Sequence, residues 1–118
     1  MTVTIYHNPR CSKSRAALTL LHGRGIEPRV VEYLKTPPDE GALRQILAML
    51  RLRPRQLLRP AEAKAAGLDD PALDDDALIR GMLAHPSVIE RPIVVAGDRA
   101  CVGRPPERVL ELLDDTDN

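Results

Sequence analysis

The first 33 residues contain two short apolar stretches separated by a helical pattern, and this order restricts the fold more than any other feature. Val3 and Ile5 alternate with polar residues and predict a strand. The segment from about Ser12 to the glycines at 23 and 25 has the apolar spacing of a helix, and residues 29–33 predict a second strand. A strand, a helix and a strand within so short a length form a βαβ unit, in which the two strands are parallel and the crossover is right-handed.

The rest of the chain predicts helices, then a hairpin, then a last helix. A helix is expected after the start signal Thr36-Pro37-Pro38-Asp39, with Thr36 as its hydroxyl cap, followed by a weak short helix over 61–67 and a helix over 74–85. Strands are expected over 93–95 and 100–102, on either side of a turn at Gly97-Asp98. Pro105-Pro106 then opens a last helix, which ends in a frayed tail over 114–118.

These elements fit a single domain over residues 1–118. The expected fold is an α/β sandwich, with a mixed sheet of about four strands, helices on both faces and a helical insertion in the middle. Arg91-Pro92 directly precedes the strand at 93–95, and a proline entering a strand there favours a cis peptide bond. Thioredoxin-like folds carry a cis-proline at that place, facing the active cysteine. The order of elements and this proline therefore predict a thioredoxin-like fold.

The composition excludes several classes of function. The 17 basic and 17 acidic residues balance, so no general attraction to nucleic acid or to a membrane follows. Neither Trp nor Phe is present, which leaves two tyrosines for stacking on bases. No window has the length of a membrane span, and the first residues lack the features of a signal peptide. Two cysteines 90 positions apart do not make a disulfide framework, and reduced cysteines indicate a cytoplasmic protein, which we expect to be a monomer.

Cys11 is the residue best placed for chemistry, because it lies between the first strand and the first helix. N–H groups without partners at a helix start, together with the helix dipole, favour a thiolate. Arg10, Lys13 and Arg15 add positive charge in the same turn. A free cysteine is most often a small buried residue, but this position favours a nucleophile. Ser14 stands where a Cys-x-x-Cys pair would hold its second cysteine, so no local disulfide can form, and its hydroxyl could donate to the thiolate.

His7 and three arginines are the other candidate site residues. His7 lies four residues before Cys11, where an imidazolium would help to hold the charge, and a surface histidine is an equal alternative. Arg59, Arg91 and Arg104 each precede a proline at the end of an element, from where their side chains could converge on a cleft. Guanidinium groups bind tetrahedral oxyanions through paired, charge-assisted hydrogen bonds, whereas most arginines are solvated surface charges.

No metal or bound cofactor is expected. His22 and His85 do not pair with a cysteine at a metal-ligand spacing, and no Walker or dinucleotide glycine pattern occurs. Cys101 lies in a predicted strand, and its most economical interpretation is a core or edge thiol.

Four motifs in order resemble the glutaredoxin-linked arsenate reductase family, most closely its short bacterial branch. These motifs are His7 to Arg15, Leu57-Leu58-Arg59, Glu90 to Val95 and Gly103 to Glu107. The resemblance implies that the Cys11 thiolate attacks arsenate, that Arg59, Arg91 and Arg104 hold the oxyanion, and that His7 and Ser14 support the thiolate. It also implies that glutathione and glutaredoxin act as external reductants and complete the reduction to arsenite. Because Ser14 is not a cysteine, turnover needs an external thiol.

Two other functions remain open at this point. One is a glutathione-dependent thiol reductase that acts on another substrate. The other is a redox-sensing transcription regulator of the same fold, which binds RNA polymerase and has no turnover. Such regulators typically sense oxidation through Cys-x-x-Cys, and Ser14 argues against this alternative.

Overall fold

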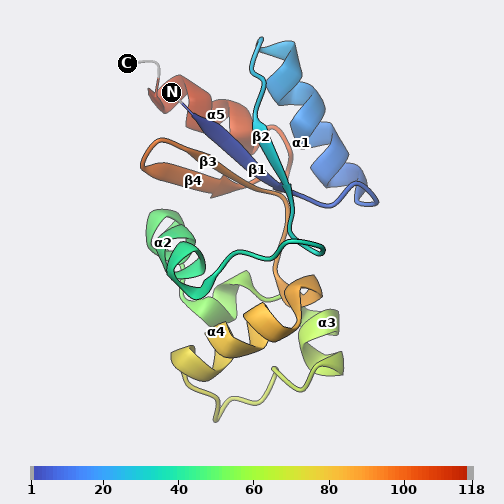
Figure 1. The fold of residues 1–118 in the computed structure, drawn as a ribbon, viewed down its shortest axis with the longest axis vertical. Helices are drawn as coiled ribbons and strands as arrows, with labels where there is room; N and C mark the ends of the chain where they lie inside the picture. The colour runs from blue at the N-terminus through green and yellow to red at the C-terminus, as the bar shows by residue number, and fades with distance from the viewer. Residues whose placement is uncertain (1, 117–118) are drawn as a thin grey trace. The chain divides into compact units, whose positions relative to one another are not determined.

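The computed structural model describes residues 2–116, which form two compact units (Figure 1). The first unit joins the N-terminal segment up to Thr36 with the segment that starts at Arg91, and the second runs from Pro37 to Glu90. The first contains β1 (Val3–His7), α1 (Ser12–Gly23), β2 (Arg29–Glu32), β3 (Ile93–Ala96), β4 (Arg99–Val102) and α5 (Arg108–Thr116). The second contains α2 (Glu40–Leu50), η1 (Pro54–Leu57), α3 (Pro60–Ala65), α4 (Asp75–Ala84) and η2 (Pro86–Val88). The second unit is thus the helical insertion that the sequence predicts, and one domain over the whole chain stays a prediction.

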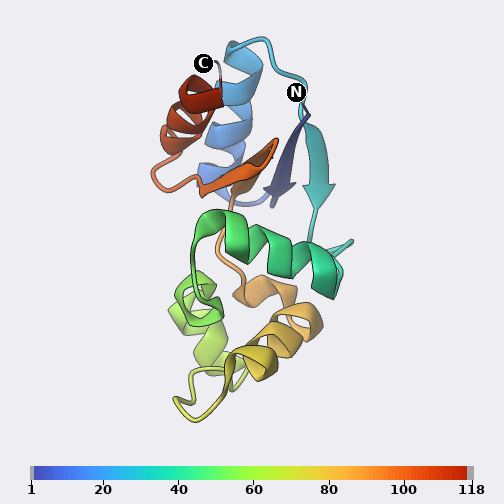
Figure 2. The ribbon, with the colours of Figure 1, turned by 90° about the vertical axis from the view of Figure 1, so that its left-hand side faces the viewer.

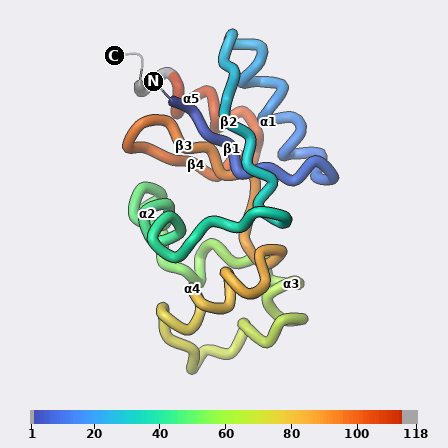
Figure 3. Tube along the Cα trace, viewed as in Figure 1, coloured from blue at the N-terminus to red at the C-terminus, as the bar shows by residue number. Residues whose placement is uncertain are grey.

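The four strands of the first unit form one mixed sheet in the order β2-β1-β3-β4. β1 pairs in parallel with β2 and antiparallel with β3, and β3 pairs antiparallel with β4. The trace in Figure 3 shows β1 between the strand that follows it in sequence and one from the far end of the chain. The parallel pair confirms the βαβ unit, and the mixed sheet of four strands confirms the predicted α/β class.

Helices α1 and α5 pack together on one face of this sheet (Figure 2). Helices were expected on both faces of the sheet; within this unit, α1 and α5 share one face. The face is apolar because odd-numbered residues of β1 and even-numbered residues of β3 point to the same side. The buried cluster consists of Val3, Ile5, Ala17, Leu21, Val94, Ala96, Val109, Leu112 and Leu113.

Two loops at the ends of β3 and β4 contain cis-prolines. The Arg91–Pro92 bond is cis, as predicted, and the Arg104–Pro105 bond is also cis, which the sequence analysis did not predict. The N–H of Gly103 donates to the carbonyl of Pro92 at 2.8 Å and holds the two loops side by side. At the opposite end of the hairpin, Gly97 has a φ of +64° in the two-residue turn between Ala96 and Arg99, as expected for a glycine at that place.

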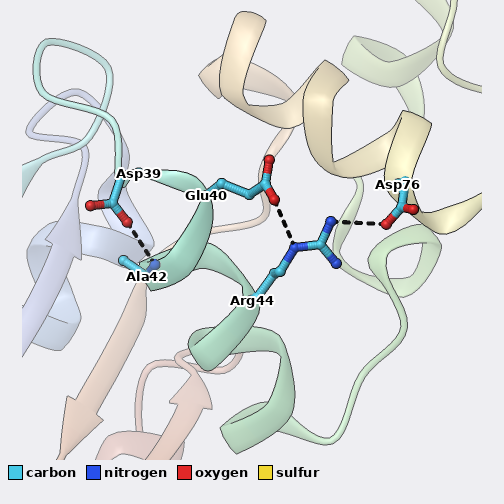
Figure 4. A network of polar contacts seen from close by, with 5 residues as sticks. All are labelled: Asp39, Glu40, Ala42, Arg44 and Asp76. Atoms are coloured by element: carbon cyan, nitrogen blue, oxygen red, sulfur yellow. Dashed lines mark hydrogen bonds and ion pairs between the residues drawn. The ribbon is translucent and has the colours of Figure 1, made fainter.

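In the second unit, α2 starts later than predicted. Asp39, rather than Thr36, is the N-cap, and its Oδ1 accepts the N–H of Ala42 at 2.8 Å (Figure 4). The physical reason is that a residue before proline avoids the helical region, so Pro37 and Pro38 keep the preceding residues extended. The carboxylate of Asp39 is then the first side chain able to cap the helix.

Arg44 connects α2 to α4 within this unit. Its Nε donates to Glu40 at 3.1 Å and its Nη2 to Asp76 at 2.8 Å, as the dashed lines in Figure 4 show. The side chain of Asp74 caps α4 by accepting the N–H of Ala77 at 2.8 Å. Because Asp76 lies in the first turn of α4, Arg44 links the two helices through exposed ion pairs.

The last helix is longer than predicted. α5 continues to Thr116, so the expected tail is helical over residues 114–116, and residues 117–118 lie outside the described part of the chain. In residues 2–116, no helix combines the length and the apolar character needed to cross a bilayer.

Candidate active site

Cys11 occupies the N-cap position of α1, as the sequence predicts. Its backbone is extended, its carbonyl accepts the first helical hydrogen bond from the N–H of Arg15 at 3.0 Å, and its own N–H donates to the carbonyl of Asn8 at 3.0 Å. The side chain is partly exposed. The sulfur therefore lies at the N-terminus of α1, where the first N–H groups have no acceptor within the helix. This position is favourable for a thiolate or an oxyanion.

Arg104 brings a positive charge to this sulfur. Its Nη2 lies 3.8 Å from Cys11 Sγ, and its Nε donates to the carbonyl of Arg91 at 2.8 Å. The backbone N–H of Arg104 also donates to the carbonyl of Val102, at 2.9 Å. One nitrogen of the guanidinium is thus fixed by a backbone carbonyl, and another contacts the sulfur. The single flexible ammonium of a lysine could not make both contacts in a fixed plane.

His7 and Ser14 form a buried pair at the end of β1. His7 Nδ1 and Ser14 Oγ are 2.6 Å apart, and Ser14 Oγ also accepts the N–H of Asn8 at 3.0 Å. The residues are 6% and 0% exposed. Burial lowers the pKa of His7; Glu32 raises it by a smaller amount and Arg15 lowers it further.

This arrangement differs from the expectation for both residues. The lowered pKa of His7 favours a neutral imidazole over the expected imidazolium, because burial disfavours the charged form. Within the described residues, the hydroxyl of Ser14 bonds to His7 and Asn8 and makes no hydrogen bond to Cys11.

The other two arginines have different positions. Arg91 lies in the first unit, where its carbonyl anchors Arg104 and its side chain is partly buried. Arg59 lies in the second unit, where its Nη1 is 2.8 Å from a carboxylate oxygen of Glu62 and its Nε is 3.8 Å from Glu90. The structure therefore brings Arg104 to Cys11, and the oxyanion-binding roles of all three arginines stay predictions.

Sequence reasoning missed how Asn8 and Arg15 shape the loop before Cys11. Asn8 Oδ1 accepts the N–H of Arg10 at 3.0 Å, and Arg15 Nη1 donates to the carbonyl of Pro9 at 2.9 Å. An asparagine that directly follows a strand and precedes a proline is a signal for such a turn. The contact of Arg15 with a carbonyl six residues earlier has no comparable signal in the sequence.

Cys101 has the properties of an unreactive thiol. It is partly buried in β4, and its S–H donates to the carbonyl of Arg108 at 3.8 Å. Burial raises the pKa of Cys101 to about 11, while Arg108 lowers it and Glu111 raises it by smaller amounts. Within residues 2–116, no group of three or more His, Cys, Asp and Glu side chains could hold a metal ion.

Comparison with known proteins gives one consistent result. The model of the ArsC family matches residues 6–112. The chain is 51% identical over 114 residues to an arsenate reductase of Neisseria meningitidis, with 94% of this chain and 97% of that protein covered. It is 44% identical over 117 residues to the arsenate reductase of Escherichia coli, with 96% and 82% covered.

A solved structure agrees with these relatives. The arsenate reductase from Vibrio cholerae superposes with a TM-score of 0.90 at 49% sequence identity, covering 94% of this chain and 97% of that one. Identity and coverage at this level extend through the whole sheet and the helical insertion. The chain therefore belongs to the ArsC family.

Proposed function

We propose that this protein is an arsenate reductase that uses Cys11 as its nucleophile and takes its electrons from glutathione and glutaredoxin. The observation that carries the proposal is the position of Cys11: its sulfur lies at the N-terminus of α1 with the guanidinium of Arg104 3.8 Å away. Helix N-terminal N–H groups and a guanidinium both stabilise a thiolate, and both also bind an oxyanion. The similarity to proteins named arsenate reductase supports the choice of arsenate.

The proposed reaction starts with attack of the Cys11 thiolate on As(V). A sulfur–arsenic bond forms, an arsenic–oxygen bond breaks, and that oxygen leaves as water. Glutathione then forms a second sulfur–arsenic bond and displaces a second water. The thiolate of glutaredoxin attacks the sulfur of the bound glutathione, and the electron pair of that sulfur–arsenic bond stays on arsenic. Arsenic is reduced to As(III), the two external thiols become one disulfide, and water releases arsenite from Cys11.

The properties of Ser14 and Cys101 support the use of external thiols. Ser14 occupies the position of a second cysteine and is 0% exposed, and Cys101 is held as a protonated thiol because its pKa is about 11. Neither can resolve an intermediate on Cys11. A reducing compartment such as the cytoplasm, where glutathione is abundant, suits this chemistry.

The test is an arsenate-dependent assay with each thiol donor supplied separately. With glutathione and glutaredoxin we expect arsenite to form, and omission of either thiol should lower the rate. Cys11→Ser should abolish the reaction, while Cys101→Ser is the matched control that should retain it. A wild-type protein that oxidises no thiol in response to arsenate would refute the assignment. A strong preference for a glutathionylated peptide would instead favour a thiol reductase with another substrate.

A further inference from the structure

The hydrogen bonds of Ser14 determine which protonation state its neighbour His7 can adopt. A serine hydroxyl has one proton to donate and lone pairs that accept. Ser14 Oγ accepts the N–H of Asn8 at 3.0 Å, and its other contact is His7 Nδ1 at 2.6 Å. Within the described residues, Ser14 has no further hydrogen-bond partner. Its proton therefore has one available acceptor, which is His7 Nδ1.

A charged His7 would break this pairing. In the imidazolium, Nδ1 carries a proton and can only donate to Ser14 Oγ. The hydroxyl proton of Ser14 would then lack an acceptor in a side chain that is 0% exposed, and a buried donor without a partner is unfavourable. In a neutral imidazole with its proton on Nε2, Nδ1 accepts the hydroxyl proton of Ser14. Ser14 Oγ can then still accept the N–H of Asn8, so the hydrogen bonds of His7 Nδ1, Ser14 and Asn8 are all formed.

The charges around His7 agree with a neutral imidazole. Glu32 lies opposite His7 on β2 and is the group that would favour the charged form, but it is partly exposed and its carboxylate is 3.7 Å from the ammonium of Lys35. Arg15 on α1 disfavours a second positive charge. Burial of the ring is the largest influence and lowers the pKa of His7.

The neutral pair is connected to the nucleophile through the backbone. Ser14 Oγ fixes the N–H of Asn8, and the carbonyl of Asn8 accepts the N–H of Cys11 at 3.0 Å. Removing the acceptor at position 7 would free Ser14 to rotate and would loosen Asn8. The sulfur would then lose its fixed position at the helix start and beside Arg104.

We infer that His7 is a positioning residue, which accepts the hydroxyl proton of Ser14 as a neutral imidazole, while Arg104 supplies the positive charge beside Cys11. The inference deepens the proposed function and rests on Cys11 being the nucleophile. The sequence suggested that His7 would supply positive charge; the inference instead gives His7 the role of orientation and Arg104 the role of charge.

The protonation state can be measured directly on the full-length protein. With ¹⁵N-labelled histidine, we expect NMR spectra at pH 7 to show His7 as the neutral tautomer with its proton on Nε2, and the same tautomer at pH 6. An imidazolium pattern for His7 at pH 7 would overturn the inference. This measurement uses the wild type, so it does not depend on any variant that fails to fold.

Two substitutions separate orientation from charge. His7→Asn can place an amide oxygen where Nδ1 accepts, without any positive charge, and His7→Leu removes the acceptor. The readout is the rate at which iodoacetamide alkylates Cys11 at pH 7, followed by peptide mass spectrometry. Because one hydrogen bond is lost, we expect His7→Leu to react roughly tenfold more slowly and His7→Asn to recover to within about threefold of the wild-type rate.

His22→Asn is the matched control, because His22 is an exposed histidine of α1 and its substitution should not change the rate. Equal slowing by His7→Asn and His7→Leu would show that the charge of His7 matters, and no slowing in either would show that His7 has no positioning role. Alkylation needs no arsenate. A protein that fails to reduce arsenate would therefore refute the proposed function while the role of His7 is still decided.

Discussion

Arg104 Nη2 lies 3.8 Å from Cys11 Sγ, although the two residues are 93 positions apart in sequence. The contact depends on the sheet: β1 delivers the loop that carries Cys11, and β4, two strands away, delivers Arg104. The carbonyl of Arg91 fixes the guanidinium from the other side at 2.8 Å. A cation aligned in this way can stabilise a thiolate and, in the proposed reaction, would also contact the oxyanion.

The geometry of Arg104 predicts that lysine cannot replace it. Arg104→Lys keeps the charge but cannot bond to the carbonyl of Arg91 and approach the sulfur with a second nitrogen in a fixed plane. Because a hydrogen bond to a charged group is lost or misdirected, alkylation of Cys11 at pH 7 should slow by roughly tenfold. Arg29→Lys, at an exposed position of β2, is the control. Equal rates for the two variants would show that only net charge matters.

The hydroxyl of Ser14 predicts a measurable contribution to stability. Ser14→Ala removes the acceptor of the Asn8 N–H and the partner of His7 Nδ1, and the side chains of both Ser14 and His7 are buried. The free energy of unfolding, measured in urea, should fall by about 1–3 kcal/mol, the usual effect of leaving buried polar groups without partners. Ser12→Ala, in the exposed first turn of the same helix, should change it by less than about 0.5 kcal/mol. Because alanine is the better helix former, helix propensity cannot cause a loss in either variant, and similar losses in both would show that the buried hydrogen bonds of Ser14 are not its cause.

Much of the fold could be predicted because its signals are local. The alternation of Val3 and Ile5, the Gly97-Asp98 turn and the proline after Arg91 each specify backbone geometry within a few residues. The structure confirms the parallel βαβ unit, the hairpin and the cis bond at Pro92. Thr36 failed as a cap because two prolines compete with the helix start, which is a balance between two local signals.

The candidate site was only partly predictable because its chemistry depends on burial and on tertiary contacts. The position of Cys11 before a helix is visible in the sequence, and so is the suitability of an arginine for an oxyanion. The contact of Arg104 with Cys11 requires the sheet order, which no local pattern contains. The lowered pKa of His7 follows from a ring that is 6% exposed, and sequence alone left that histidine equally suited to the surface.

The space around Gly103 is too small for a larger residue. A Cβ at this position would lie 2.9 Å from Cγ of Pro92 and 3.3 Å from Cγ1 of Val109, closer than ordinary contacts. Gly103→Ala should therefore push the Arg104 loop away from the Pro92 loop and lower the free energy of unfolding by roughly 1–3 kcal/mol, as overpacking usually does. Gly23→Ala is the control, since no atom lies within 4 Å of its Cβ. Equal free energies of unfolding for Gly103→Ala and Gly23→Ala would contradict this prediction, because they would show that the Pro92 and Arg104 loops can move apart without cost.

The two cysteines should differ sharply in reactivity. Burial raises the pKa of Cys101 to about 11, so only about one thiol in ten thousand is a thiolate at pH 7. A short treatment with iodoacetamide at pH 7 should modify Cys11 alone, giving one adduct by mass spectrometry. Cys101→Ser should give the same single adduct and Cys11→Ser none. Prompt modification of Cys101 in the folded protein would contradict its assignment as an unreactive thiol.

The same raised pKa predicts a loss of stability in alkaline solution. An unfolded cysteine titrates near pH 8.5, whereas Cys101 in the folded protein keeps its proton until about pH 11. Between these values the unfolded state releases a proton that the folded state retains, so the free energy of unfolding must fall as pH rises. The contribution is fully present below about pH 8.5 and is lost by about pH 11. Urea unfolding of the wild type from pH 8 to 11 should therefore decline more steeply than that of Cys101→Ala, in which all other titrating groups are the same. Parallel declines would show that Cys101 titrates alike in both states.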